Sequence, residues 1–260
     1  MDLYKAKKKF GQNFLIDDII INDIINNFNH KKDDKVIEIG PGLSAITDPL
    51  IQTLDKLIAI EIDKDLVYFL QNKYKNYGNF CILEKNVLEL DFTKFGSKLR
   101  LIGNLPYNIT SKLLLKLIKY SDQVIDQHFM LQKEVADRIT SLNNNSNYGR
   151  LSVILQLHYR ITKLFDISPN SFNPKPKVTS SFIRMVPLSK NKNKIIDYNM
   201  FEDVIKKAFL QKRKMLRHSI GLWSKIIPWE EIGIKPTDRA ENLSVEDFIK
   251  LSNAITLKNF

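Results

Sequence analysis

Residues 35–45 read KVIEIGPGLSA, an apolar run that passes directly into a turn containing two glycines. The run KVIEIG (35–40) lacks the polar alternation of a half-exposed strand, so it predicts a strand covered on both faces. Gly40 and Gly42 let the backbone turn sharply and lie close to a ligand. The pattern also fits G-x-G-x-x-A, so a nicotinamide or flavin dinucleotide and a purely local turn remain open as interpretations.

The first 135 residues continue this alternation of short apolar runs and helix-length segments. The helical segments are SAITDPLIQTL, in which Pro49 delays or kinks the helix, KDLVYFLQNKY and SKLLLKLIKY. Further strands are predicted at KLIAIEI (56–62), NFCILEK (79–85), LRLIGN (99–104), QVIDQHFML (123–131), RLSVILQLHYR (150–160) and TSSFIRMVP (179–187). This rhythm predicts a doubly wound, Rossmann-like α/β sheet whose ligands bind at the carboxyl ends of its strands.

A change of pattern follows the polar stretch KNKNK at 190–194, which we interpret as a linker. Beyond it the sequence predicts helices only, at about 199–210, 212–220 and 244–255. We therefore expect two domains: a Rossmann-like domain over 1–189 that begins with a basic arm, and a small basic α-helical domain over 195–260.

The composition is that of a folded protein of a reducing compartment. Hydrophobic residues make up 43% of the 260 residues, which excludes a disordered chain. The one cysteine, Cys81, excludes an intramolecular disulfide and a cysteine-rich zinc site, and no apolar run approaches the roughly 18 residues of a membrane span. The four histidines are scattered without metal-ligand spacing: His30, His128, His158 and His218. We expect a cytoplasmic protein without a membrane segment or a metal.

The net charge of +11 is concentrated in two parts of the chain. Residues 1–10 contribute +3 and residues 171–220 contribute +9, so the rest of the chain is close to neutral. Within the second window, KKAFLQKRKMLRHSI (206–220) has cations three or four residues apart, which on one helix would form a cationic stripe. Such a stripe favours a nucleic-acid partner, and the alternative is an ordinary solvated helix face.

Two polar motifs stand at the ends of predicted strands. Glu61, at the end of the second strand, is placed to accept hydrogen bonds from both hydroxyls of an adenosine ribose, unless it is only an exposed carboxylate. The fourth strand ends in Asn104-Leu105-Pro106-Tyr107. An adenine amine is a poor nucleophile because its lone pair is delocalised into the ring. The Asn104 amide oxygen and a backbone carbonyl of Leu105 or Pro106 could accept its two N–H bonds while Tyr107 stacks on the ring.

With these motifs, the chain resembles the KsgA-type ribosomal RNA adenine dimethyltransferases, a family of class I S-adenosylmethionine-dependent methyltransferases. Nine blocks carry the resemblance nearly from end to end: KKKFGQNFLID (7–17), VIEIGPGL (36–43), AIEID (59–63), IGNLPYNIT (102–110), FMLQKEVADR (129–138), YGRLSV (148–153), FNPKPKV (172–178), AFLQKRK (208–214) and RAENLS (239–244). The resemblance implies a class I methyltransferase domain, with S-adenosylmethionine as cofactor and a small C-terminal helical domain.

The same resemblance implies which residues form the site. The cofactor would be bound by Asn13, Leu15, Gly40, Gly42, Glu61, Asn86 and Asn104, and the reaction centre would be Asn104, Leu105, Pro106 and Tyr107. Phe172 would stack on the target base opposite Tyr107, unless it is a core residue. Asn86 stands where the family usually has an aspartate, which predicts weaker cofactor binding because the amide lacks the charge. Ser44 and Thr179 are two further departures, from a glycine and an aspartate.

The implied reaction needs no general base, because the proton leaves after the methylated nitrogen has become cationic. The implied substrate is small-subunit rRNA in an immature small ribosomal subunit, with two adjacent adenosines of the 3′-terminal hairpin each methylated twice. The RNA-binding residues would be Lys7, Lys8, Lys9, Lys175, Lys177, Lys206, Lys207, Lys212, Arg213, Lys214 and Arg217. The alternatives are a large-subunit rRNA methyltransferase of the macrolide-resistance type and a non-catalytic assembly or transcription factor. We expect a monomer.

Overall fold

The computed structural model describes residues 6–7, 10–188 and 195–258, and the predicted linker at 190–194 lies outside these residues. The chain divides into two compact units. The first consists of Met1–Ala136 and Arg160–Pro187, and the second of Asp137–Tyr159 and Leu188–Phe260. The second unit therefore also includes residues 137–159, which the sequence analysis assigns to the first domain.

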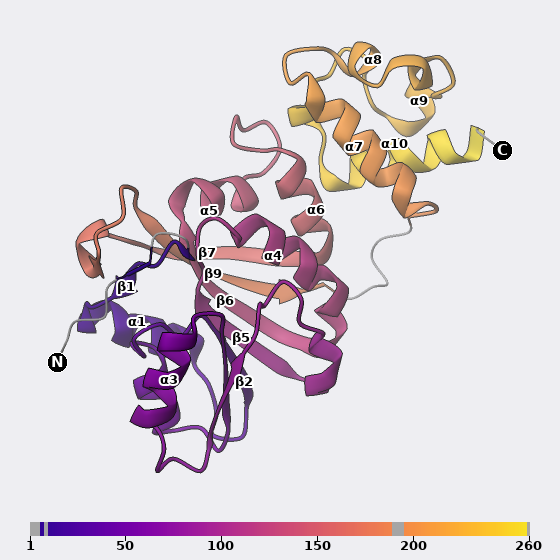
Figure 1. Ribbon diagram of the computed structural model, residues 1–260. Helices are drawn as coiled ribbons and strands as arrows, with labels where there is room; N and C mark the ends of the chain where they lie inside the picture. Colours follow the sequence, from indigo (N-terminus) through magenta and orange to yellow (C-terminus); the bar gives the residue numbers. More distant parts are fainter. Residues whose placement is uncertain (1–5, 8–9, 189–194, 259–260) are drawn as a thin grey trace. The chain divides into compact units, whose positions relative to one another are not determined.

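The described residues of the first unit form a seven-stranded sheet in the order β4-β3-β2-β5-β6-β9-β7. Figure 1 labels β2, β5, β6, β9 and β7 of this sheet. The strands β2 to β6 pair in parallel, and β9 pairs antiparallel with β6. A second, two-stranded sheet joins β1 to β8. The bounds are β1 Phe14–Leu15, β2 Lys35–Ile39, β3 Leu57–Glu61, β4 Phe80–Glu84, β5 Leu99–Asn104, β6 Val124–Gln132, β7 Tyr159–Ile167, β8 Phe172–Asn173 and β9 Ser180–Pro187.

Helical segments alternate with the strands from β1 to β6, as a doubly wound fold requires. The bounds of the α-helices are α1 Asp18–Phe28, α2 Thr47–Ile51, α3 Lys64–Lys73, α4 Thr110–Leu117, α5 Lys133–Thr140, α6 Arg150–His158, α7 Tyr198–Leu210, α8 Leu216–Ser219, α9 Trp229–Ile232 and α10 Val245–Lys258. The predicted α/β class, with a helical C-terminal region, is confirmed. Pro49 lies in the first turn of the short α2, as expected of a helix that starts late.

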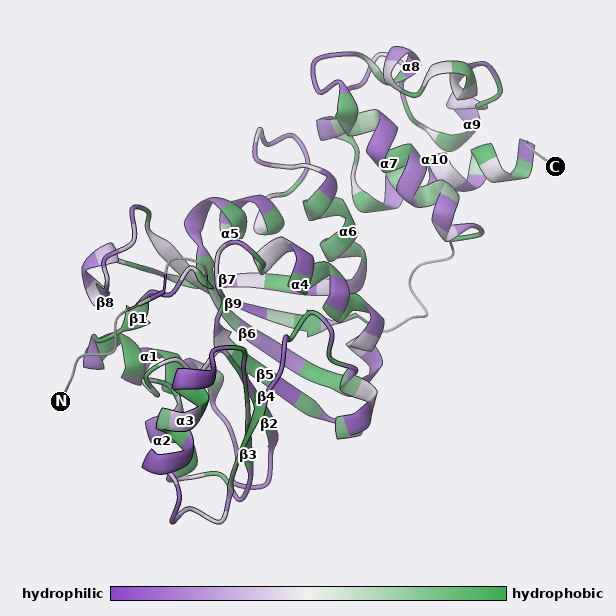
Figure 2. Ribbon diagram, viewed as in Figure 1, coloured by the Kyte–Doolittle hydropathy of each residue, from purple (hydrophilic) through white to green (hydrophobic). Residues whose placement is uncertain are grey.

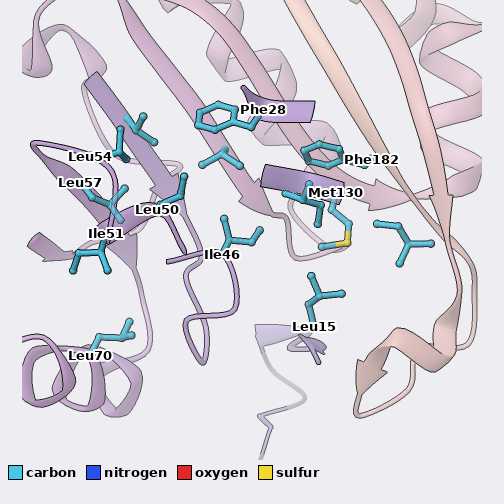
Figure 3. Close-up of a cluster of buried hydrophobic side chains, with 14 of the residues drawn as sticks. Leu15, Phe28, Ile46, Leu50, Ile51, Leu54, Leu57, Leu70, Met130 and Phe182 are labelled. Atoms are coloured by element: carbon cyan, nitrogen blue, oxygen red, sulfur yellow. The ribbon is translucent and has the colours of Figure 1, made fainter. Parts of the chain in front are cut away.

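One hydrophobic cluster holds α1, α2 and α3 against the sheet (Figure 3). Phe28 of α1, Leu50 of α2 and Leu70 of α3 are fully buried in it together with Met130 and Phe182 of the sheet. The strands at the centre of the sheet carry hydrophobic residues interrupted by polar ones (Figure 2), and most residues of both kinds are buried because helices or loops cover both faces. This packing fixes the strand ends, where the turns to the helices begin.

The predicted strand at 150–160 is wrong. Residues Arg150–His158 form helix α6, and β7 begins only at Tyr159. Val153, Ile154 and Leu155 are buried although they are consecutive in the helix. A short apolar run that is buried on all sides has no periodicity to separate a helix from a strand.

The predicted helix at 212–220 is also mostly wrong. Helix α7 ends at Leu210, and within 212–220 the α-helical residues are Leu216–Ser219, which form α8. Between the two helices Met215 forms a β-bridge with Arg239, and the Leu216 N–H donates to the Asp238 carbonyl at 2.7 Å. This pairing takes up backbone groups that a continuous helix would use, so the basic residues of 206–220 do not lie on one helix.

The second unit is otherwise a helical unit with its own core. Phe201 and Val204 of α7 are fully buried, as are Phe248 and Leu251 of α10. In the described part of the chain, no helix has both the length and the apolar character needed to cross a membrane.

Candidate active site

A cavity of about 340 Å³ lies at the carboxyl ends of β2, β3 and β5. Its wall is made of residues 10–15, the glycine turn after β2, the end of β3, the loop after β4, and residues 104–109 at the end of β5 and in the loop that follows it. The structure brings ten of the predicted site residues together in this wall: Asn13, Leu15, Gly40, Gly42, Glu61, Asn86, Asn104, Leu105, Pro106 and Tyr107.

The glycine turn exposes its backbone to the cavity. Gly40 and Gly42 have φ angles of +70° and +57°, which favour glycine. A Cβ atom on Gly42 would lie 3.0 Å from Cδ1 of Phe14, so a side chain there would push against the opposite wall. The Gly40 N–H donates to the Ile60 carbonyl at 2.9 Å, which ties the turn to β3. The turn thus offers a backbone surface that a nucleotide-sized ligand can approach closely.

Glu61 is a buried carboxylate at the cavity wall, with 7% of its surface exposed. Its Oε1 accepts hydrogen bonds from the backbone N–H groups of Ile62 at 2.8 Å and Asp63 at 3.0 Å. Burial raises the pKa of Glu61, and these backbone bonds partly oppose the effect. The arrangement holds the carboxylate in place, so that it can accept the two hydroxyl groups of a ribose.

Asn86 is more constrained than the sequence suggests. Its Oδ1 accepts from the Leu88 N–H at 3.0 Å, and its Nδ2 donates to Oε1 of Glu89 at 2.8 Å. Both ends of the side chain therefore take part in ordering the loop after β4. One lone pair of Oδ1 remains for a ligand amine.

The side chain of Asn104 has a fixed orientation. Its Nδ2 donates to the backbone carbonyl of Asn13 at 2.9 Å. Since a carbonyl can only accept, the amide must turn its NH₂ group toward Asn13 and leave Oδ1 as the acceptor on its other side. Gly103, which precedes it, lies so close to β2 that a Cβ atom would be 2.2 Å from the Ile39 carbonyl oxygen.

The two candidate backbone acceptors are not equivalent. The Pro106 carbonyl already accepts from the Ile109 N–H at 3.1 Å and from Oγ1 of Thr110 at 3.0 Å. Both of its lone pairs are therefore used in the first turn of α4. The Leu105 N–H donates to the Met130 carbonyl at 3.0 Å, which fixes this residue without engaging its own carbonyl. Of the two, the Leu105 carbonyl is the available acceptor.

Of the two aromatic residues predicted to stack on the target base, one lines the cavity and the other does not. Tyr107 lines the cavity, and its hydroxyl is 2.8 Å from Oγ of the buried Ser180 on β9. Burial raises the pKa of Tyr107. Phe172, expected opposite it, is not part of the cavity wall: it is 3% exposed and packs in the hydrophobic core, with its backbone paired to Leu15. The alternative of a core phenylalanine describes its position, and Phe10 and Phe14 line the cavity instead.

Glu38 was not singled out from the sequence, although it lies in the cavity wall. It is fully buried on β2, Oγ1 of Thr47 donates to its Oε2 at 2.7 Å, and burial raises its pKa to about 8. The available signal was an acidic residue inside an apolar strand directly before the glycine turn, since such a residue is buried only with a partner.

The predicted RNA-binding residues are divided between the two units. Lys8 and Lys9 lie outside the described residues. Lys7 is engaged by Asp63 and Asp65, each at 2.6 Å, and Nζ of Lys207 lies 3.5 Å from the ring centroid of Trp223. The others are exposed: Lys175 and Lys177 in the first unit, and Lys206, Lys212, Arg213, Lys214 and Arg217 in the second.

Comparison with known proteins gives consistent matches over nearly the whole chain. The model of a family described as ribosomal RNA adenine dimethylase matches residues 3–257. A protein of Bordetella petrii named ribosomal RNA small subunit methyltransferase A is 46% identical, with 98% of this chain and 97% of that protein covered. Its namesake in Neisseria meningitidis is 43% identical, with 99% of each chain covered.

Solved structures share the fold. A dimethyladenosine transferase from Plasmodium falciparum superimposes with a TM-score of 0.82 at 26% identity, covering 95% of this chain and 98% of that one. The 23S rRNA methyltransferase ErmE superimposes with a TM-score of 0.75 at 20% identity, covering 94% and 100%. At that identity the second likeness concerns the fold alone. Both neighbours place the first unit among the class I methyltransferase folds.

Proposed function

Because this chain belongs to the ribosomal RNA adenine dimethylase family and is an S-adenosylmethionine-dependent methyltransferase, we propose that it dimethylates the N6 amines of two adjacent adenosines in small-subunit rRNA. The proposed target is the 3′-terminal hairpin of an immature small subunit in the cytoplasm, with the enzyme acting as a monomer. The relatives named for the small subunit are 43–46% identical over nearly the full chain, which supports this substrate over large-subunit rRNA.

The observation that carries the proposal is the pair of acceptors at the end of β5. The Asn13 carbonyl accepts from Nδ2 of Asn104 and thereby fixes the orientation of the amide, with Oδ1 as the remaining acceptor. The Leu105 carbonyl is the available neighbouring acceptor, because the Pro106 carbonyl already accepts two hydrogen bonds. Two neighbouring acceptors would accept both N–H bonds of an adenine amine. They thereby localise the nitrogen lone pair and direct it into the cavity. Tyr107 is held by Ser180 beside them and supplies a stacking surface.

The residues of the cavity suit the cofactor. S-adenosylmethionine, when bound, supplies an electrophilic methyl group on a sulfonium centre. Glu61 would accept the ribose hydroxyls, and the open backbone of Gly40 and Gly42 would accommodate the cofactor at close range. Asn13, Leu15 and Asn86 would complete the wall. The chain's own contribution is then positioning and electrostatics, without a covalent intermediate.

The target adenine must leave its stack to reach this cavity. Tyr107 would receive one face of the extruded base. Since Phe172 is buried in the core, we propose that its stacking role requires the β1–β8 pair to open, or that an aromatic residue of the cavity wall takes its place.

The test is transfer of labelled methyl groups to small ribosomal subunits that lack their methyl marks, followed by nucleoside analysis, with large subunits in parallel. We expect dimethyladenosine in small-subunit rRNA only. Asn104→Ala should abolish transfer while RNA affinity stays within about twofold, because the side chain contacts the reacting base and not the phosphates. Label in large-subunit rRNA would move the assignment to that substrate. RNA binding without transfer by the wild type would favour a non-catalytic factor.

A further inference from the structure

The segment before α1 forms one continuous side of the cavity. Residues 10–15 all line it. At its carboxyl end this segment is fixed by the β1–β8 pairing, in which Leu15 lies opposite Phe172. On its amino-terminal side the segment is preceded by Lys7, which lies outside the cavity wall and forms an ion pair with Asp63.

Nζ of Lys7 lies 2.6 Å from Oδ1 of Asp63 and 2.6 Å from Oδ2 of Asp65. The side chain of Asp63 is only 1% exposed, whereas that of Asp65 is 67% exposed. Gln12 adds a second bond, because its Nε2 donates to Oδ2 of Asp63 at 3.0 Å. A carboxylate as buried as Asp63 is stable in its charged form only with such partners. The buried member of this group therefore sets the position of the segment.

Hydrogen bonds carry this position into the site. The Lys7 N–H donates to Oε1 of Gln12 at 2.7 Å, so the two residues that hold Asp63 also hold each other. Asn13 follows directly, and its carbonyl accepts the hydrogen bond from Nδ2 of Asn104 at 2.9 Å. A displacement of Asn13 would release the Asn104 amide from the only orientation that presents Oδ1 to a target amine.

We propose that the Lys7–Asp63 ion pair is a positioning element of methyl transfer, which acts through Asn13 to orient the Asn104 amide. Lys7 is then a positioning residue and not a phosphate contact of the basic arm, which is the role that the sequence assigns to it. The inference rests on the proposed function, because it concerns the orientation of the acceptor for the adenine amine.

The test variant is Lys7→Met, which removes the positive charge but keeps an unbranched side chain of similar length. We expect kcat for methyl transfer to fall by about tenfold to a hundredfold, the cost of a displacement on the order of 1 Å at a reacting group. The KM for rRNA and the salt dependence of rRNA binding should stay as in the wild type. Lys7→Arg, which keeps the charge, should restore most of kcat.

The partner residue supplies the second half of the test. Asp63→Asn removes the charge but keeps an acceptor for the Asp65 N–H, which Asp63 caps at 3.1 Å at the start of α3. We expect it to lower kcat as Lys7→Met does, and the double variant to be no worse than either single one. The matched control is Lys64→Ala, which breaks the exposed neighbouring pair with Glu84 at 3.6 Å and should leave kcat unchanged.

The outcomes separate the two proposals. If Lys7→Met keeps the wild-type kcat but loses rRNA affinity, with the salt slope reduced by about 0.7, Lys7 is a phosphate contact and the inference is overturned. Additive losses in the double variant would overturn it as well, since the two residues would then act separately. A wild-type protein that transfers no methyl group at all would instead remove the proposed function and the inference with it.

Discussion

Ser44 is a non-glycine residue in the left-handed region of the glycine turn, with a φ of +79°. The residue is fully buried, and its Oγ accepts from Nζ of Lys73 at 2.6 Å and donates to Oδ2 of Asp48 at 3.1 Å. A side chain with positive φ costs on the order of 1 kcal/mol or more in backbone strain, and these bonds offset that cost.

Two variants of Ser44 isolate this strain. Ser44→Ala and Ser44→Gly both lose the hydroxyl bonds, but only the alanine keeps a Cβ at positive φ. We expect the glycine variant to be more stable than the alanine variant by about 1 kcal/mol, as measured by urea unfolding. Equal stabilities would mean that the turn relaxes when the hydroxyl is removed.

The sequence predicts the location of site residues at strand ends better than the location of residues whose burial depends on how distant strands pair. Asn104, Glu61 and Gly40 could be placed in one site because the carboxyl ends of parallel strands meet at one edge. Phe172 could not, because its burial follows from the antiparallel pairing of β1 with β8, two strands of two residues each. The role of Lys7 depends on a contact across 56 residues, which a charge pattern does not reveal.

Among the elements, β2 and β5 are the pair that the site depends on most. They run in parallel, and Gly103 of β5 lies very close to the Ile39 carbonyl of β2. A Cβ atom added at Gly103 would lie only 2.2 Å from that carbonyl oxygen. The contacting atom belongs to the backbone of a central strand, so it cannot move aside cheaply. The glycine turn begins at the residue after Ile39, and Asn104 begins the acceptor motif on the other strand.

Gly103→Ala should therefore destabilise the protein by about 3 kcal/mol or more, the upper range for overpacking. Urea unfolding would measure the loss, and the folded fraction should also bind S-adenosylmethionine more weakly. Gly78→Ala is the matched control, because a Cβ there has no neighbour within 4 Å; its unfolding free energy should change by no more than about 0.5 kcal/mol. A tolerated Gly103→Ala would show that the two strands can separate.

Element types were predictable where the apolar pattern had a clear period or position. The predicted strands 35–40, 56–62 and 99–104 correspond to β2, β3 and β5 within one or two residues. Helix α6 was missed because its apolar residues leave no polar face. The helix is interrupted at 211–215, where Met215 pairs with Arg239. Local helix propensity carries no information about such a contact between residues far apart in the sequence.

Over the whole molecule, the charge excess supports an interaction with RNA phosphates, but from separate elements and not from one helix. Lys206 lies on α7, Lys212, Arg213 and Lys214 lie in the connection that follows, and Arg217 lies on α8. If five such cations contact phosphates, the salt slope of binding should be about −3.5, at roughly −0.7 per contact to a single strand.

Replacing Lys212, Arg213 and Lys214 by alanine should make that slope about 2 units shallower, as measured by RNA binding from low to high salt. The control variant replaces Lys31, Lys32 and Lys56, three exposed lysines that precede β2 and β3 at the amino ends of the strands. It removes the same charge and should leave the slope unchanged. Equal changes in both variants would attribute the effect to net charge alone.

Acid stability of the whole protein should depend on one buried imidazole. His128 on β6 is fully buried, neither ring nitrogen has a hydrogen-bond partner among the described residues, and burial lowers its pKa to about 4. Asp126, Arg100 and Arg184 are the charged groups that act on it. Since an unperturbed histidine has a pKa near 6.5, the stability associated with neutral His128 is full above that pH and is lost as the pH falls toward 4.

We expect this contribution to lower the unfolding free energy by about 2 kcal/mol between pH 6.5 and pH 5. The measurement compares the wild type with His128→Phe, a ring that fits the aromatic contacts with Phe28 and Phe182 at centroid distances of 5.1 and 5.9 Å. The difference between the two curves should change by this amount between pH 6.5 and pH 5 and become independent of pH above about pH 7. A constant difference across the range would assign the effect to packing and not to protonation.

The position of β9 between β6 and β7 also determines the order in which these strands can pair while the chain is being synthesised. A growing chain completes β7 at Ile167 before β9 has begun at Ser180, so β7 has no neighbour to pair with when it emerges. At roughly 5–20 residues per second, translation needs on the order of a second or more to deliver β9. During that interval β6 has an open edge, and Tyr107 lacks Ser180. The cavity wall can therefore form before the strand that secures its aromatic residue.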